Sequence, residues 1–211
     1  MIATPRKPSI SPFSPTDREE RLQIDELRRM TLGEYHRLIE IGFFTPDDKV
    51  ELLDGYLVRK MPQDDPHAVL VDVLPEVLKS ILPAKWTVRA QLPVTLVGDS
   101  EPEPDAVVCL GPKKRYFAGH PTAKDIPIVI EVADSTIRRD RTIKMGIYAR
   151  NRIPFYWIVN IPGRIVEVYS KPLVGRSPRY RVRTDFPVGS KIPVIISDET
   201  LAEFSVDEIL V

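Results

Sequence analysis

The sequence has little cysteine, little histidine and no excess of charge of either sign. A single cysteine, Cys109, excludes an intramolecular disulfide and a cysteine-based zinc site, and three scattered histidines do not form a histidine-rich metal cluster. Any bound metal is therefore expected to have oxygen ligands. Lysine plus arginine equals aspartate plus glutamate at 30 each, so only a local cluster of charge could indicate a nucleic-acid partner.

Long apolar runs and fixed-period repeats are also missing from the sequence. No segment approaches the ~20 apolar residues that span a bilayer, and no N-terminal stretch has the apolar length of a signal peptide. We therefore expect a cytoplasmic protein with no membrane contact. Residues 1–21 carry prolines and serines without apolar periodicity and predict a flexible tail, whereas residues 22–211 suffice for a single domain.

Local patterns predict helices and strands along most of the chain. Thr31 followed by Glu34 forms a capping box at a helix start, and Asp54-Gly55 between two strand-like runs is a strong hairpin signal. Apolar periods of about 3.6 and 2 residues separate the other helices from the strands. The expected elements are a helix at 32–41, a hairpin centred on 54–55, a helix at 66–82, strands at 86–96, 104–110 and 126–133, a helix at 137–150, strands at 155–161, 164–170, 179–183 and 192–196, and a short helix at 205–210.

The order of these elements between residues 66 and 161 is helix, three strands, helix, strand. This order predicts an α/β fold in which helices pack on the faces of one sheet. The N-terminal helix and hairpin and the C-terminal strands are additions to that core.

Two predicted strands, at 104–110 and 126–133, each carry a carboxylate: one at its start and the other within its apolar run. Glu131 interrupts an apolar strand, so burial requires it to have a partner or a cation. Asp105 opens the preceding strand, and Glu51 on the hairpin could add a third oxygen donor. Such carboxylates suit Mg²⁺, which takes one or two of them with waters and phosphate oxygens. Two alternatives stay open: an ion pair of Glu131 with an arginine, and a solvent-facing Glu51.

Other polar residues near these strands have simpler interpretations. Asp99, Glu101 and Glu103 are expected to form a solvated acidic turn. Gln91 could touch a water or the metal, or could be a cross-strand hydrogen-bond partner. His67 could approach a substrate, but we expect it to be solvated in the first turn of its helix.

The helix at 137–150 is basic where the strand before it is acidic. Arg138, Arg139 and Arg141 lie at or near its start, where backbone N–H groups also favour anions, so they are candidates for binding nucleic-acid phosphate.

Lys144 has an unusual position on the same helix. At about 100° per residue, Ile143, Ile147 and Tyr148 define an apolar face that includes Lys144, with Asp140 one turn earlier. The amine is therefore expected to point toward the sheet. The alternative is an Asp140–Lys144 pair whose amine reaches solvent.

These residues resemble a known nuclease motif. Pro104-Asp105, followed after a loop by Glu131-Val132-Ala133, resembles the PD-(D/E)XK motif, and the element order is similar to the core of that superfamily. Five blocks over roughly residues 30–170 resemble the Uma-like family of restriction-type endonucleases. These blocks are KVELLDGYLV, QLPVTLVGDSEPEPDAVV, IPIVIEVADST, RDRTIKMGIYAR and IPFYWIVNIPGRIVEVYS.

The resemblance implies a restriction-endonuclease-like core and a Mg²⁺-dependent endonuclease acting on DNA, with Mn²⁺ as a substitute metal. Asp105 and Glu131 would bind the metal together with the backbone carbonyl of Val132. Glu51 would serve a second metal or orient a water.

The sequence departs from the motif at one position. The motif lysine two residues after the glutamate is replaced by Ala133, and the resemblance favours Lys144 on the following helix as the displaced lysine. The zero net charge and this missing lysine also fit an inactive nuclease-like module that binds nucleic acid or protein. A plain interaction protein is a third interpretation, and a homodimer stays open.

Overall fold

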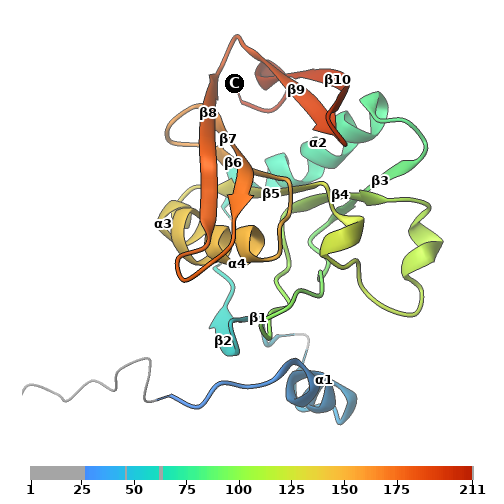
Figure 1. Cartoon of the computed structure of the whole chain (residues 1–211), viewed down its shortest axis with the longest axis vertical. Coiled ribbons are helices and arrows are strands. Elements are labelled where there is room, and N and C mark those ends of the chain that lie inside the picture. Colours follow the sequence, from blue (N-terminus) through green and yellow to red (C-terminus); the bar gives the residue numbers. More distant parts are fainter. Residues whose placement is uncertain (1–26, 46, 62–63, 211) are drawn as a thin grey trace, which may run out of the picture.

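The computed structural model describes residues 27–45, 47–61 and 64–210 (Figure 1). The tail predicted for residues 1–21 lies outside the described residues, and the assignment of 22–211 to one domain stays a prediction. The centre of the fold is a six-stranded sheet whose strands follow one another in chain order. They are β3 (Trp86–Ala90), β4 (Ala106–Leu110), β5 (Ile128–Ala133), β6 (Phe155–Asn160), β7 (Ile165–Leu173) and β8 (Arg179–Pro187).

One pair in this sheet is parallel and the other four are antiparallel. The parallel pair is β5 and β6, and parallel neighbours require a crossover connection. That connection is a continuous helical segment of three parts: α3 (Ile137–Arg139), a π turn labelled η4 (Asp140–Lys144) and α4 (Met145–Arg150). Two 3₁₀ turns, η2 (Lys113–Tyr116) and η3 (Ala123–Asp125), interrupt the link between β4 and β5.

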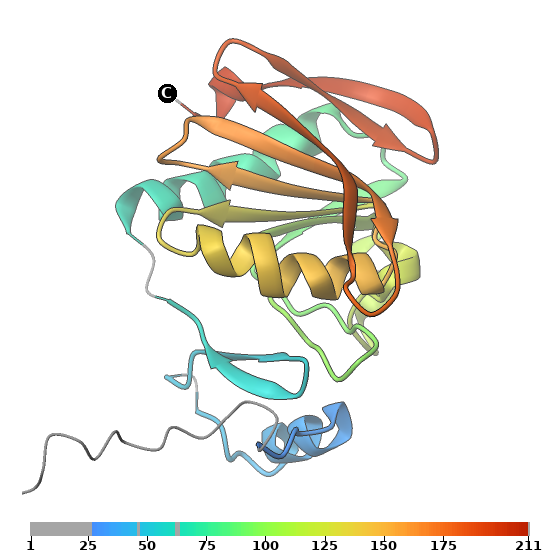
Figure 2. The same cartoon turned by 60° about the vertical axis from the view of Figure 1, so that its left-hand side comes forward.

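Helices cover both faces of the sheet (Figure 2). α2 (Asp65–Ile81) packs on one face, where Ile128, Ile130 and Val132 of β5 contribute to its core. The helical segment of α3 and α4 packs on the other face, which carries Val129, Glu131 and Ala133. The period of two along β5 therefore sends Glu131 to the face of α4. The predicted order of helix, three strands, helix and strand is confirmed.

The C-terminal strands form a separate hairpin above α2. β9 (Lys191–Ile196) pairs with β10 (Glu199–Ser205), and the 3₁₀ turn η5 (Val206–Glu208) follows. The ring of Phe204 stacks on Trp157 of the main sheet, which joins this hairpin to the core on the α2 side. β10 is absent from the sequence prediction because its own pattern is weak: only Phe204 in it is buried, and pairing with β9 makes it a strand.

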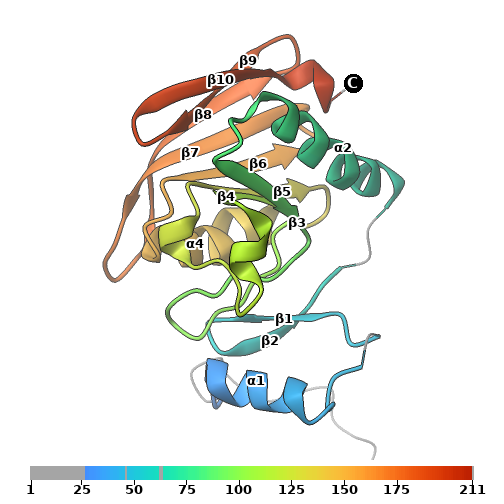
Figure 3. The same cartoon turned by 90° about the vertical axis from the view of Figure 1, so that its right-hand side faces the viewer.

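The N-terminal helix and hairpin lie on the opposite side of the molecule, with the hairpin between the helix and the sheet (Figure 3). α1 (Leu32–Glu40) begins at the predicted capping box. β1 (Val50–Leu53) and β2 (Tyr56–Arg59) turn at Asp54 and Gly55, whose φ angles of +51° and +80° suit the turn that this dipeptide favours.

Two sequence predictions about regular structure need correction or comment. The strand predicted over 86–96 ends at Ala90, because Gln91 adopts a φ of +50° and Pro93 has no N–H to continue a ladder. Within the described part of the chain, no helix combines the length and apolar character needed to cross a membrane.

Candidate active site

A pocket of about 920 Å³ opens where the hairpin, the ends of β4 and β5, and the π turn meet. It is polar, and side chains of both charges line it. Among its lining residues are all four predicted catalytic residues, the predicted carbonyl ligand and one of the three predicted DNA-binding arginines: Glu51, Asp105, Glu131, Lys144, Val132 and Arg139. Residues up to 93 positions apart in the sequence, from Glu51 to Lys144, thus share one cavity.

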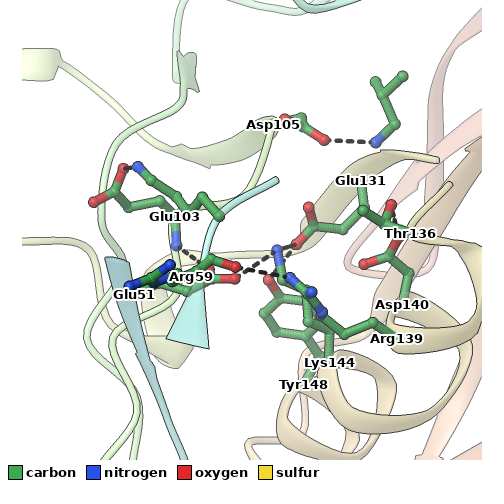
Figure 4. A network of polar contacts seen from close by, with 12 residues as sticks. Glu51, Arg59, Glu103, Asp105, Glu131, Thr136, Arg139, Asp140, Lys144 and Tyr148 are labelled. Atoms are coloured by element: carbon green, nitrogen blue, oxygen red, sulfur yellow. Dashed lines mark hydrogen bonds and ion pairs between the residues drawn. The ribbon is translucent and has the colours of Figure 1, made fainter. Parts of the chain in front are cut away.

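The centre of the pocket is a contact between Lys144 and Glu131. The ammonium Nζ lies 3.0 Å from Glu131 Oε1 and 3.5 Å from Glu51 Oε1. Tyr148 donates its hydroxyl to the same Glu131 oxygen at 2.6 Å. Figure 4 shows Lys144 and Tyr148 reaching Glu131 from the helical segment, with Glu51 on the opposite side. A single oxygen of Glu131 therefore accepts two strong hydrogen bonds.

This geometry decides the alternatives that the sequence leaves open. Among the described residues, Glu131 pairs with a lysine and a tyrosine rather than an arginine. Lys144 is only 7% exposed, so its amine does not reach out to solvent. Glu51 is buried, and its Oε2 accepts the backbone N–H of Glu103 at 3.1 Å.

The buried charges perturb one another. Burial disfavours the ammonium of Lys144, but the attraction of Glu131, Glu51 and Asp140 outweighs it and raises the pKa of Lys144. Burial raises the pKa of the Glu131 carboxyl well above its usual range, against the pull of Lys144, and the negative charges of Asp105 and Asp140 add to that rise. Lys144 is therefore an ammonium in a pocket that has too little positive charge for its carboxylates.

Asp105 lies just before β4, at the mouth of the same pocket. Its Oδ2 accepts the backbone N–H of Val132 at 2.8 Å, so it is tied to the strand that carries Glu131. His67 of α2 reaches the same oxygen, with Nε2 3.4 Å away. The contacts of Val132 and His67 both involve Oδ2, so they fix one oxygen of Asp105 while the carboxylate lines the pocket.

The expectation of a solvated His67 is wrong. Its side chain is 14% exposed and lines the pocket, and its Nδ1 is buried with no hydrogen-bond partner among the described residues. Burial lowers the pKa of His67, but the hydrogen bond to Asp105 outweighs this and raises it overall. The position of His67 in the first turn of α2 does not predict its contact with Asp105, because Asp105 lies 38 residues away in the sequence.

The helical face predicted for Lys144 is partly wrong. Ile147 and Tyr148 are buried as expected, but Ile143 is 49% exposed. The reason is the π turn, in which Met145 N–H bonds to Asp140 O, five residues back. One extra residue in the turn rotates the next part of the helix by about 100° relative to an uninterrupted α-helix. Asp140 and Lys144 are thereby both buried, and Asp140 accepts a hydrogen bond from Thr136 at 2.6 Å.

The three predicted DNA-binding arginines have different surroundings. Arg139 lines the pocket and donates to the backbone carbonyl of Arg59 at 3.3 Å. Arg138 is exposed outside the pocket lining. Arg141 is held by Glu167, to which its Nε donates at 3.0 Å and its Nη2 donates a second bond. Of the three, only Arg139 faces the pocket; a role in DNA binding stays a prediction for each.

The segment 99–103 is not a solvated acidic turn as a whole. Glu101 is buried and accepts hydrogen bonds from Thr95 at 2.7 Å and from His36, whose Nε2 lies 3.0 Å from both carboxylate oxygens. Glu103 lines the pocket and is paired with Lys60. Only the exposed Asp99 fits the expectation for solvent exposure. Gln91 is exposed at the pocket edge and contributes to the lining.

Comparisons with known proteins identify the family and the fold. A family model described as "Putative restriction endonuclease", named Uma2, matches residues 32–201. The chain belongs to the Uma2 family. A crystal structure titled as a putative nuclease from Anabaena variabilis ATCC 29413 is similar to this Uma2 chain, with a TM-score of 0.62 and 16% identity over 85% of this chain and 97% of that one. At that identity the likeness shows the shared fold alone. The comparison with curated proteins gives no match.

Proposed function

We propose that the protein is a divalent-metal-dependent endonuclease that hydrolyses phosphodiester bonds in DNA. The observation that carries the proposal is the 3.0 Å contact of Lys144 with Glu131 in a pocket that Asp105 also lines. A buried lysine and two carboxylates are the groups that the nuclease motif requires, and Ala133 cannot supply the amine. Membership of the Uma2 family supports a nuclease.

The donor set of the pocket fits Mg²⁺. Within the described residues, no three acidic, histidine or cysteine side chains converge closely enough to hold a metal by themselves. Mg²⁺ does not need such a cage, because it keeps several waters and binds through one or two carboxylates and substrate phosphate. The carboxylates of Asp105 and Glu131 and the carbonyl of Val132 would hold it. The negative charges of Asp105 and Asp140 beside Glu131 support this, since a bound cation would offset them.

A bound Mg²⁺ supplies Lewis acidity to the phosphate and lowers the pKa of a coordinated water. The protein's own groups do the rest. Because the pKa of Lys144 is raised, its amine carries a proton and donates hydrogen bonds rather than removing a proton from water. Its ammonium would stabilise the negative charge that develops on the attacking water and on the phosphate oxygens. Glu51, on the other side of the amine, would orient that water.

Among the three predicted DNA-binding arginines, Arg139 is the one placed to hold a DNA strand in the pocket. It lines the pocket from the helical segment and reaches the hairpin at Arg59, and an arginine matches phosphate with two parallel donors. Arg138 and Arg141 would contact DNA outside the pocket. The substitution of Mn²⁺ for Mg²⁺, a homodimer and a cytoplasmic location stay predictions.

A second candidate function is an inactive nuclease-like module that binds nucleic acid or protein. One observation favours it: the ammonium of Lys144 lies 3.0 Å from Glu131 and offsets part of the charge of that carboxylate. In this case Asp105 and Glu131 would have only structural roles, and their neutral amide counterparts would leave binding unchanged.

The experiment that tests the proposal is a metal-dependence assay on a mixture of single- and double-stranded DNA and RNA. The parent protein should cut DNA with Mg²⁺ or Mn²⁺ and should not cut with EDTA. Asp105→Asn should abolish cleavage and weaken Mg²⁺ binding measured by calorimetry. Asp72→Asn is the matched control, because Asp72 is exposed on α2 and does not line the pocket. A parent that binds DNA but cuts nothing with any metal would leave the binding module as the function.

A further inference from the structure

A second buried carboxylate lies on the same face of the sheet as Glu131. In the strand register, Glu131 of β5 is opposite Ile158 of β6, and Ile158 is opposite Glu167 of β7. Glu131 and Glu167 are therefore two strand spacings apart in one cross-strand row, about 10 Å. Glu167 is 0% exposed, which makes it one of the most deeply buried charged groups described.

The partners of Glu167 satisfy both of its oxygens. Asn160 Nδ2 donates to Oε1 at 2.9 Å, and the Tyr169 hydroxyl donates to Oε2 at 2.6 Å. Arg141 adds two parallel bonds, one to each oxygen. Although burial acts in the opposite direction, these donors lower the pKa of Glu167, so it is a carboxylate. A charged group fixed by this many donors is a rigid anchor point.

The π turn connects this anchor to the candidate active site. Arg141 and Lys144 are both in the turn, three residues apart, and each reaches one of the two carboxylates in the row. The turn thus contacts the sheet at two charged points. A π turn is a rare and locally weaker geometry than the α-helix, and it persists where surrounding contacts hold it.

We propose that the Arg141–Glu167 pair is a positioning device for Lys144. By fixing the turn at Glu167, the pair holds the helical register in which the Lys144 amine points at Glu131 and Glu51. Without it the segment can relax toward a regular α-helix, which would turn Lys144 about the helix axis relative to Arg141 and take the amine away from the pocket. This inference rests on the proposed function only for its effect on cleavage.

Glu167 has a second cationic neighbour, which allows positioning of Lys144 to be tested apart from neutralisation of the Glu167 charge. Arg183 of β8 is a second cation near the same carboxylate, with Nη2 3.5 Å from Glu167 Oε1. It comes from a strand and not from the helical segment, so it can neutralise Glu167 but cannot hold the turn. Arg141→Met and Arg183→Met are therefore matched variants that remove one cation each.

The test uses the full chain labelled with ¹⁵N-lysine, in which the shielded Lys144 ammonium gives an NMR signal that Lys144→Ala identifies by its loss. Arg141→Met should broaden or shift that signal and lower kcat by about 10-fold or more with little change in KM, as expected when a group that orients an active-site residue is lost. Arg183→Met should leave both close to those of the parent. Equal effects of the two variants, or an unmoved Lys144 signal in Arg141→Met, would overturn the inference.

A double variant keeps the test decisive if Arg141→Met folds poorly. Arg141→Met with Glu167→Met removes both charges, so no buried carboxylate is left unpaired. The double variant should fold, as judged by thermal unfolding, yet its Lys144 signal should stay displaced. If the double variant restores the parent signal, Arg141 only neutralises Glu167 and the inference fails. If the parent itself never cuts, the proposed function fails, and the NMR signal still decides whether the pair positions Lys144.

Discussion

Replacement of Lys144 by methionine should destabilise the fold strongly, by an amount that depends on pH. The ammonium lies 3.0 Å from Glu131 and 3.5 Å from Glu51, and all three side chains are buried. With an effective dielectric constant of about 20, each contact is worth about 5 kcal/mol of attraction before desolvation is counted. Loss of one partner from a buried ion pair typically costs about 3–5 kcal/mol in the free energy of unfolding.

The pH dependence comes from the carboxylate that the substitution leaves behind. Burial already raises the folded-state pKa of Glu131 in the parent, and loss of the opposing ammonium raises it further. Between the unfolded-state pKa of about 4.3 and the raised folded-state pKa, the folded variant binds more protons than the unfolded chain. Its stability therefore falls as pH rises through this window. Because the pKa of Lys144 is raised in the folded parent, the stability that its ammonium contributes there persists throughout the window.

The assay is urea unfolding of parent and Lys144→Met at pH 5 and pH 8. The difference in free energy should be about 3–5 kcal/mol at pH 8 and smaller at pH 5, where Glu131 can take up a proton. Lys191→Met is the control, because Lys191 and Glu203 are 4.0 Å apart and their side chains are 68% and 62% exposed, so its effect should be within about 1 kcal/mol. A Lys144→Met variant within about 1 kcal/mol of the parent at both pH values would refute the buried pair.

Three further predictions concern the pocket. Arg139→Ala should weaken DNA binding at low salt and reduce the slope of log affinity against log salt by about one in a fluorescence-anisotropy titration, and an unchanged slope would place the DNA elsewhere. His67→Asn should weaken Mn²⁺ binding measured by calorimetry by about 10-fold, because it removes the contact that orients Asp105, and equal affinity would make His67 a packing residue only. Ala133→Lys in the Lys144→Ala background should restore part of the Mg²⁺-dependent cleavage, and a folded double variant without cleavage would contradict the idea that the amine has moved.

Local sequence signals were sufficient for the elements whose cause is local. The capping box of Thr31 and Glu34 forms as predicted, and so does the turn at Asp54-Gly55, since each depends on residues within a few positions of one another. The apolar run interrupted by Glu131 also forms a buried strand, as predicted. The helical face that carries Ile147 and Tyr148, together with the family resemblance, pointed to Lys144 as the displaced amine, and its role in catalysis stays a prediction.

The errors arise where a distant contact or a change of helix type decides the outcome. Ile143 is exposed because the π turn shifts the helical register, and a constant angle of about 100° per residue cannot predict such a turn. The contact of His67 with Asp105 was missed because Asp105 belongs to another element that is distant in the sequence. The strand predicted at 86–96 ends before Gln91 because Gln91 has a positive φ. The alternating side chains of this segment give no sign of that backbone angle.

The acidic segment at 99–103 shows how distant contacts assemble the pocket. The Asp99 carboxylate accepts the backbone N–H of Leu32 at 2.9 Å, so it joins the start of α1 to this segment. Glu101 N–H donates to the carbonyl of Leu52 at 2.8 Å, and Glu103 N–H donates to the side chain of Glu51. The hairpin is therefore bonded along the segment that leads into Asp105.

These bonds fix Glu51 to the segment that leads into Asp105, through the N–H of Glu103. Asp105 in turn accepts the N–H of Val132, the residue next to Glu131. The three carboxylates are thus linked through backbone groups rather than through loops that could move independently. This linkage explains how a hairpin outside the central sheet can present a buried charge 3.5 Å from Lys144. The acidic residues of this segment therefore act as a scaffold for the pocket. Their hydrogen-bond partners in α1 and the hairpin are distant in the sequence, so no local sequence pattern predicts this role.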